Sequence, residues 1–77
     1  MSEDGQFERQ LAERLLALRL AAGWSLDELA TQSGVSRATL SRLERAETSP
    51  TATLLSRLAR AHGLPLSRLL ADAEALP

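Results

Sequence analysis

The sequence predicts an all-α fold, arranged as a compact bundle of five helices. Residues that favour strands are scarce: one Val, no Ile, no Tyr and one Phe among 77 residues, whereas the abundant Leu and Ala favour helices. Apolar residues also recur at helical spacing in five segments, each bounded by a helix start or stop signal. A chain of this length has room for one domain, which buries about 60–65% of the surface exposed by its unfolded chain.

The first predicted helix runs from about Phe7 to Ala22 and is followed by Gly23, a typical C-terminal cap. Residues 1–6 are polar and acidic, so we expect them to form a flexible N-terminal arm. An apolar stripe at helical spacing marks the face that turns to the core. The stripe consists of Phe7, Leu11, Leu15, Leu18 and Ala22.

Two short helices are predicted next, each with its own start signal. Ser25 and Glu28 form a capping box before a helix over Leu26–Gln32. Ser36 is the cap of a helix that runs from Arg37 to about Arg45.

A tight turn separates these two helices. Gly34 can adopt the positive φ that such a turn requires. Ala30 is small enough for the helices to cross closely, and Leu40 and Leu43 turn one face of the later helix inward. These features are typical of a helix-turn-helix, in which the second helix reads DNA.

Two more helices complete the bundle. Ser49 is the expected cap of the fourth, with Pro50 at its first position and Gly63 at its end. The fifth begins near Pro65, so the folded domain covers residues 7–72 and a C-terminal tail covers residues 73–77. Apolar residues of the two helices are Leu54, Leu55, Leu58, Ala59, Leu66, Leu69 and Leu70.

Charge is unevenly distributed along the chain. The net charge is −1, but the segment 36–68 holds six Arg and two acidic residues, a local balance of +4. A basic face on a near-neutral domain suits specific DNA binding more than non-specific binding. All nine cations are Arg, whose guanidinium can contact phosphate or guanine with two hydrogen bonds.

Several other classes of protein are not indicated. The chain has no Cys and a single His, His62, so no metal site and no cofactor is expected. No arrangement of nucleophile, base and acid suggests an enzyme. Because no apolar run approaches 18 residues, we expect no membrane association and a soluble cytoplasmic protein, associated with the nucleoid.

The stretch from Leu15 to Leu70 resembles the DNA-binding domain of the XRE family, the helix-turn-helix of Cro and the phage repressors. The segments that carry the resemblance are LRLAAGWSLDELA and SGVSRATLSRLERAETSPTATLLSRLARAHGL. The resemblance implies a lambda-repressor-like fold, with the helix-turn-helix formed by the second and third helices.

Four residues are candidates for base reading. Arg37, Ala38, Ser41 and Arg42 occupy the arc of the third helix that lies opposite its apolar side. Arg can pair with guanine and Ala can touch the thymine methyl. The resemblance supports Arg37, Ala38 and Arg42 in this role. The alternative is that these side chains are simply solvated.

Other residues are candidates for phosphate contacts or for holding the fold. The expected phosphate contacts come from Ser25, Ser36, Arg45, Ser49, Thr51 and Arg19. For Ser25 and Ser36, helix capping is the main expected role. The resemblance further implies that Arg19 pairs with Glu44 as a structural bridge between the first helix and the end of the third.

The sequence departs from the family pattern at three positions. Leu26 replaces the usual polar residue that opens the second helix, which leaves Arg37 less well oriented. Ala46 replaces the usual Gly, so the exit from the third helix is expected to run longer. Ser33 occupies a position that is more often apolar.

The favoured function is a sequence-specific transcription regulator, a repressor that binds double-stranded DNA as a homodimer on a palindromic site. The leucines near the C-terminus either form a subunit contact or close the core. They are Leu64, Leu66, Leu69, Leu70 and Leu76. The family often joins this domain to a C-terminal sensor domain, which is not in this sequence; the sequence is consistent with a complete regulator and with the N-terminal fragment of a longer protein. The alternative is a protein-interaction module, such as the antitoxin of a toxin–antitoxin pair.

Overall fold

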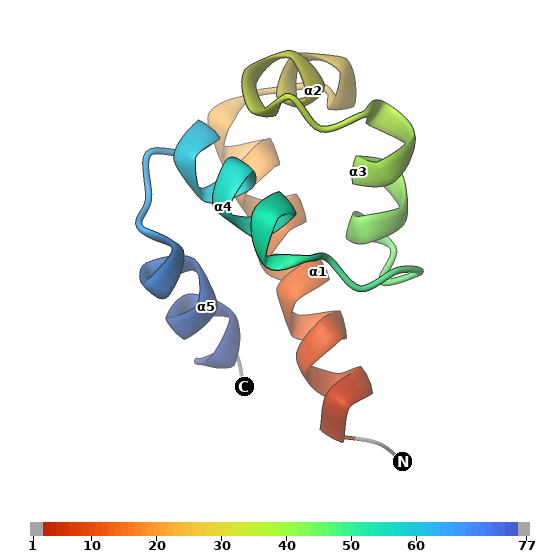
Figure 1. Ribbon diagram of the computed structural model, residues 1–77, viewed down its shortest axis with the longest axis vertical. Helices are drawn as coiled ribbons and strands as arrows, with labels where there is room; N and C mark the ends of the chain where they lie inside the picture. The colour runs from red at the N-terminus through yellow and green to blue at the C-terminus, as the bar shows by residue number, and fades with distance from the viewer. Residues whose placement is uncertain (1–2, 76–77) are drawn as a thin grey trace.

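Five α-helices joined by short turns make up the computed structural model, which describes residues 3–75 (Figure 1). The helices are α1 (Glu3–Ala22), α2 (Leu26–Ser33), α3 (Arg37–Glu44), α4 (Ala52–Ala61) and α5 (Leu66–Glu74). The described residues contain no strand. The predicted all-α, five-helix fold is confirmed.

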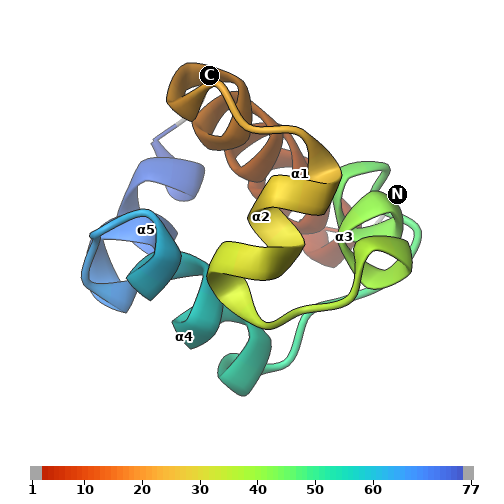
Figure 2. The same cartoon turned by 90° about the horizontal axis from the view of Figure 1, so that it is seen from above.

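The long helix α1 lies between the two sides of the domain. It packs against α3 and against α5, which lie on opposite sides of the molecule in both views (Figures 1 and 2). α2 packs against α3 and α4, and α4 packs against α5. Because α3 packs mainly against α1 and α2, its outer side remains open.

Leucines from all five helices form the core. The most completely buried of them are Leu29, Leu40, Leu58 and Leu69. Ser33 is a buried polar residue in this region, and its hydroxyl accepts a hydrogen bond of 3.1 Å from the backbone N–H of Val35. The hydroxyl therefore satisfies a backbone donor in the turn after α2, where an apolar side chain would leave it unpaired.

The turn between α2 and α3 has the predicted geometry. Gly34 adopts φ 75° and ψ 13°, and its N–H donates to the carbonyl of Ala30 at 2.9 Å. Ser25 and Glu28 form the complete capping box before α2. The Ser36 hydroxyl accepts from the N–H of Thr39 at the start of α3.

Both ends of the helical region differ from the prediction. α1 begins at Glu3 rather than Phe7, so residues 3–6 continue the helix, and Ala22 at its end is exposed. α5 extends to Glu74, and Ala73, assigned to a tail, is fully buried. Asp72 pairs with Arg14 of α1 at 3.2 Å, which holds the last turn of α5 in place. Leu76 lies outside the described residues.

The start of α4 is also different. Thr51, not Ser49, is the cap: its hydroxyl accepts from the N–H of Leu54 at 3.1 Å, and Pro50 lies before the helix. Ser49 instead donates a hydrogen bond to Glu8 of α1. The contact with α1 engages the hydroxyl of Ser49, so the next available hydroxyl caps the helix.

The exit from α3 is a left-handed turn at Ala46, followed by a connection that reaches α4 at Ala52. α3 ends at Glu44, and Ala46 adopts φ 58°, the one positive φ among the described residues that are not Gly. The N–H of Glu47 then donates to the carbonyl of Arg42 at 2.9 Å. Ala46 thus takes the backbone conformation that Gly would adopt, and it does so with a steric cost.

Replacing Ala46 by Gly should therefore stabilise the domain. We expect Ala46→Gly to raise the free energy of unfolding by about 1 kcal/mol, because the strain of a left-handed residue with a Cβ is removed. Urea denaturation measures the change. Ala71→Gly on the exposed side of α5 is the matched control and should lower stability by about 1 kcal/mol. A loss of stability in both variants would contradict this interpretation.

An aromatic contact links the turn between α1 and α2 to the end of α4. The rings of Trp24 and His62 stack with their centroids 5.2 Å apart. The Nε2 atom of His62 is buried and has no hydrogen-bond partner among the described residues. Burial and, to a lesser extent, the charge of Arg14 lower the pKa of His62 below its ordinary value of 6.5.

This lowered pKa makes stability depend on pH. The unfolded chain binds a proton at His62 more readily than the folded chain does, so the free energy of unfolding should decrease as the pH falls below about 6.5. It should level off below the folded pKa. Urea unfolding followed by Trp24 fluorescence between about pH 7.5 and 5.5 measures this dependence. The variant His62→Gln should lack the step, and an identical step in both proteins would exclude His62 as its source.

Candidate nucleic-acid interface

The outer face of α3 carries the predicted base-reading residues. Leu40 and Leu43 are each 2% exposed and fix the helix against the core. Arg37, Ala38 and Arg42 are exposed on the remaining arc. The face opposite the core is therefore free for a partner.

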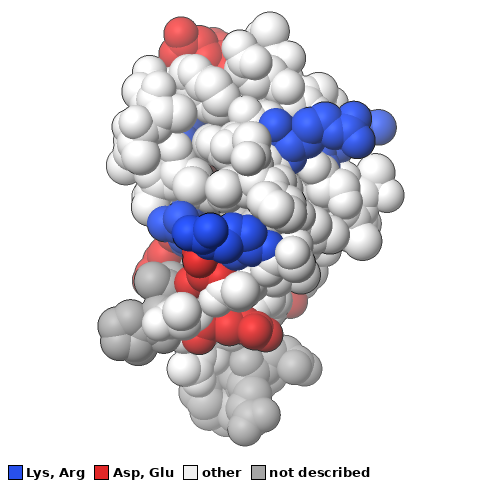
Figure 3. Space-filling view, turned by 90° about the vertical axis from the view of Figure 1, so that its left-hand side faces the viewer, with Lys and Arg blue, Asp and Glu red and all other residues white. Residues whose placement is uncertain are grey.

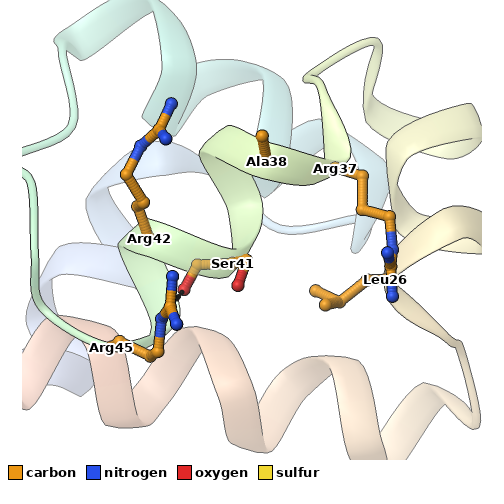
Figure 4. Close-up of a pocket in the computed structure, with 6 residues that line it drawn as sticks. All are labelled: Leu26, Arg37, Ala38, Ser41, Arg42 and Arg45. Carbon is orange, nitrogen blue, oxygen red and sulfur yellow. Dashed lines mark hydrogen bonds between the residues drawn. The ribbon is translucent and has the colours of Figure 1, made fainter.

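These side chains line one open hollow of about 480 Å³ (Figure 4). Its lining consists of Leu26, Arg37, Ala38, Ser41, Arg42 and Arg45. All four predicted base-reading residues and Arg45 are thus brought together. Leu26 joins them from the start of α2, a position that periodicity within α3 does not reveal.

The three arginines of the hollow differ in how they are held. The Nε of Arg37 pairs with Asp27 of α2 at 3.2 Å, which leaves the terminal N–H groups of the guanidinium available. Arg45 contacts the carbonyl of Ser41 and the carboxylate of Glu47, both at 3.3 Å. Arg42 forms no ion pair with any described residue. Because the Arg37 and Arg45 side chains are more than half exposed, such pairs are weak and can be exchanged for contacts with a ligand.

The predicted phosphate-contacting hydroxyls lie outside the hollow. Ser25 and Ser36 stand at the N-termini of α2 and α3, where free N–H groups favour an anion. Ser49 and Thr51 precede α4, and Thr51 serves as its cap. Contacts of these residues with phosphate remain predictions.

Arg19 and Glu44 form the bridge that the resemblance implies. The Nε and Nη2 of Arg19 donate to the two carboxylate oxygens of Glu44 at 2.7 and 2.9 Å. Its Nη1 donates to the carbonyl of Trp24 at 2.9 Å. The side chains are only 14% and 9% exposed, and hydrogen bonding to Glu44 raises the pKa of Arg19 above its ordinary value. Arg19 is thus engaged within the protein, and its contact with phosphate stays a prediction.

The side of the molecule formed by α4 and α5 has a different charge pattern. In Figure 3, which shows the left-hand side of Figure 1, one basic cluster lies directly against acidic side chains. On α5, Asp72 pairs with both Arg68 and Arg14 at 3.2 Å. The hollow on α3 is lined by no acidic side chain of residues 3–75, although Asp27 and Glu47 pair with Arg37 and Arg45 at its edges.

Two other kinds of feature are absent from the part of the chain that the structure describes. None of its helices is both long and apolar enough to cross a membrane. Its acidic and histidine side chains form no group of three or more that could hold a metal ion.

Comparison with known proteins identifies a family and several proteins that are similar to this chain. A family model described as helix-turn-helix, HTH_3, matches residues 15–69. Among curated proteins, the HTH-type transcriptional regulator SutR of Escherichia coli (strain K12) is 39% identical over 66 residues. The match covers 86% of this chain but 37% of that relative, so the chain spans well under half of its length.

Two solved structures of regulators are also similar to this chain. An HTH_3 family transcriptional regulator from Vibrio cholerae has a TM-score of 0.83 and 39% identity, over 95% of this chain and 42% of that one. The clp gene regulator ClgR from C. glutamicum has a TM-score of 0.79 and 32% identity, over 88% of this chain and 87% of that one.

The bridge between Arg19 and Glu44 should be a major contributor to stability. We expect Glu44→Ala to lower the free energy of unfolding by about 3 kcal/mol, because it leaves the charge of Arg19 largely buried and unpaired. Glu47→Ala removes the exposed partner of Arg45 and is the matched control, with an expected loss of less than about 1 kcal/mol. Urea denaturation compares the two, and similar small losses would rule out the proposed contribution of the bridge.

Proposed function

The chain belongs to the HTH_3 helix-turn-helix family, and from this premise we propose that it is a sequence-specific DNA-binding transcription regulator. In this proposal α3 enters the major groove. Arg37, Ala38, Ser41 and Arg42 read base edges, and Arg45 contacts the backbone. Such a protein acts at the nucleoid, in the cytoplasm.

The observation that carries the proposal is the arginine-lined hollow on the open side of α3. An α-helix with its side chains is about 10–12 Å across, so α3 fits within the major groove, which is about 12 Å wide. Residues at the N-terminal end of a recognition helix approach the bases first, and this end carries Arg37 and Ala38. An acidic lining would repel the phosphate backbone of DNA.

We further propose that the protein binds as a homodimer on a palindromic site and represses transcription. A single small module buries only about 600–1,000 Å² on DNA, so a second half-site is needed for tight binding. Leu69 is fully buried, so it closes the core and is not free for a subunit contact. Leu20 on α1 is 61% exposed and is a better candidate for that contact. A dimer bound across an operator blocks access to it without further contacts.

Selection from a randomised duplex pool at two salt concentrations tests the proposal. The wild type should enrich a two-fold-symmetric site, and Arg37→Ala/Arg42→Ala should lose it, because each guanine contact contributes about 1–3 kcal/mol of discrimination. Arg60→Ala/Arg68→Ala removes the same charge from α4 and α5 and is the matched control. It should enrich the same site as the wild type.

Two results would contradict the proposal. Enrichment of an asymmetric single half-site would exclude the dimer while leaving base reading by α3 intact. Equal, weak and strongly salt-dependent binding by all three proteins would exclude sequence reading. That second result would favour the protein-interaction or antitoxin alternative.

A further inference from the structure

Leu26 lines the hollow, but its side chain cannot form hydrogen bonds. Reading of bases by hydrogen bonds therefore gives it no role. It is the first residue of α2, is partly buried and packs against the core. It also lines the hollow on α3 together with Ala38. The two side chains come from different helices and contain no polar atom.

The apolar side chain of Leu26 thus borders the hollow at the end where Arg37 lies. Figure 4 shows Arg37 extending toward Leu26 at one end of the hollow, whereas Arg42 and Arg45 extend from the other end of α3. A polar atom of a base that packs against the Leu26 side chain gains no hydrogen bond from it. The apolar group that base edges present in the major groove is the 5-methyl group of thymine.

We propose that Leu26 receives the 5-methyl group of one thymine in each half-site and is a specificity-determining residue. This inference rests on the proposed function, because it requires α3 to lie in the major groove. The flanking arginines supply the charge complementarity that brings the groove against this apolar surface. The polar residue expected at position 26 would be unable to favour a methyl group in this way.

The size of the effect follows from burial of a single methyl group. Transfer of one such group out of water favours binding by about threefold to tenfold for each half-site. Substitution of deoxyuridine for thymidine removes this group and changes neither the base pairing nor the protein. The DNA therefore provides a test that does not depend on the folding of a variant.

The experiment starts from the site enriched by the wild-type protein. Each thymidine of one half-site is replaced in turn by deoxyuridine, and the dissociation constant is measured at fixed salt. We expect one position at which the wild type binds about threefold to tenfold more weakly. Leu26→Gln should bind the thymidine and deoxyuridine duplexes with less than about twofold difference at that position. Leu66→Gln, at the equivalent first position of α5, is partly buried in the same way and should retain the wild-type discrimination.

The outcomes separate the inference from the proposed function. A specific site that contains no methyl-sensitive thymine, or one whose sensitivity is unchanged in Leu26→Gln, overturns the role of Leu26 while base reading stands. Absence of any enriched site overturns the proposed function itself, and the inference with it. If Leu26→Gln does not fold, lack of methyl sensitivity in the wild type still overturns the inference.

Discussion

The two-point ion pair between Arg19 and Glu44 determines how the rest of the structure is arranged. Arg19 lies on α1, Glu44 ends α3, and the third hydrogen bond of Arg19 reaches the carbonyl of Trp24, just before α2. One guanidinium therefore connects the long helix to the beginning and to the end of the helix-turn-helix. Planar, bidentate contacts restrict orientation as well as distance. The direction in which α3 presents its outer face thus depends on a residue that lies on another helix.

A helix as short as α3 does not hold its shape by itself. Eight residues are too few for a stable isolated helix in water. α3 is therefore stabilised by the packing of Leu40 and Leu43, by the cap at Ser36 and by the left-handed turn at Ala46. The outer side chains of α3 are therefore not needed to hold the helix in place. The exposed side chains of α3 can therefore vary in sequence with little effect on the fold, whereas the residues beneath them cannot.

Much of this architecture could be predicted from the sequence because it is encoded locally. The capping box at Ser25, the turn at Gly34 and the leucine periodicity each depend on a few neighbouring residues. The structure differs from the prediction where contacts between distant segments determine the local conformation. Ser49 bonds to Glu8 and leaves the capping of α4 to Thr51, and α5 continues to Glu74 because Ala73 and Asp72 pack against other elements. In the candidate site, the residues of α3 followed from periodicity, but the position of Leu26 beside them depends on how α2 crosses α3. Likewise, the sequence indicated that Ala46 was unusual but not that the backbone would keep the left-handed turn.

The packing of α5 against α1 has a consequence for the order of events during synthesis. Leu69 and Ala73 are fully buried, and Asp72 reaches Arg14 across 58 positions of sequence. Until α5 has left the ribosome, the nascent chain lacks part of its core and the α5-facing side of α1 stays exposed to solvent. The helix-turn-helix itself is made of local contacts, which form quickly. The DNA-facing half of the domain can thus begin to fold on the ribosome, whereas completion of the core waits for the last helix.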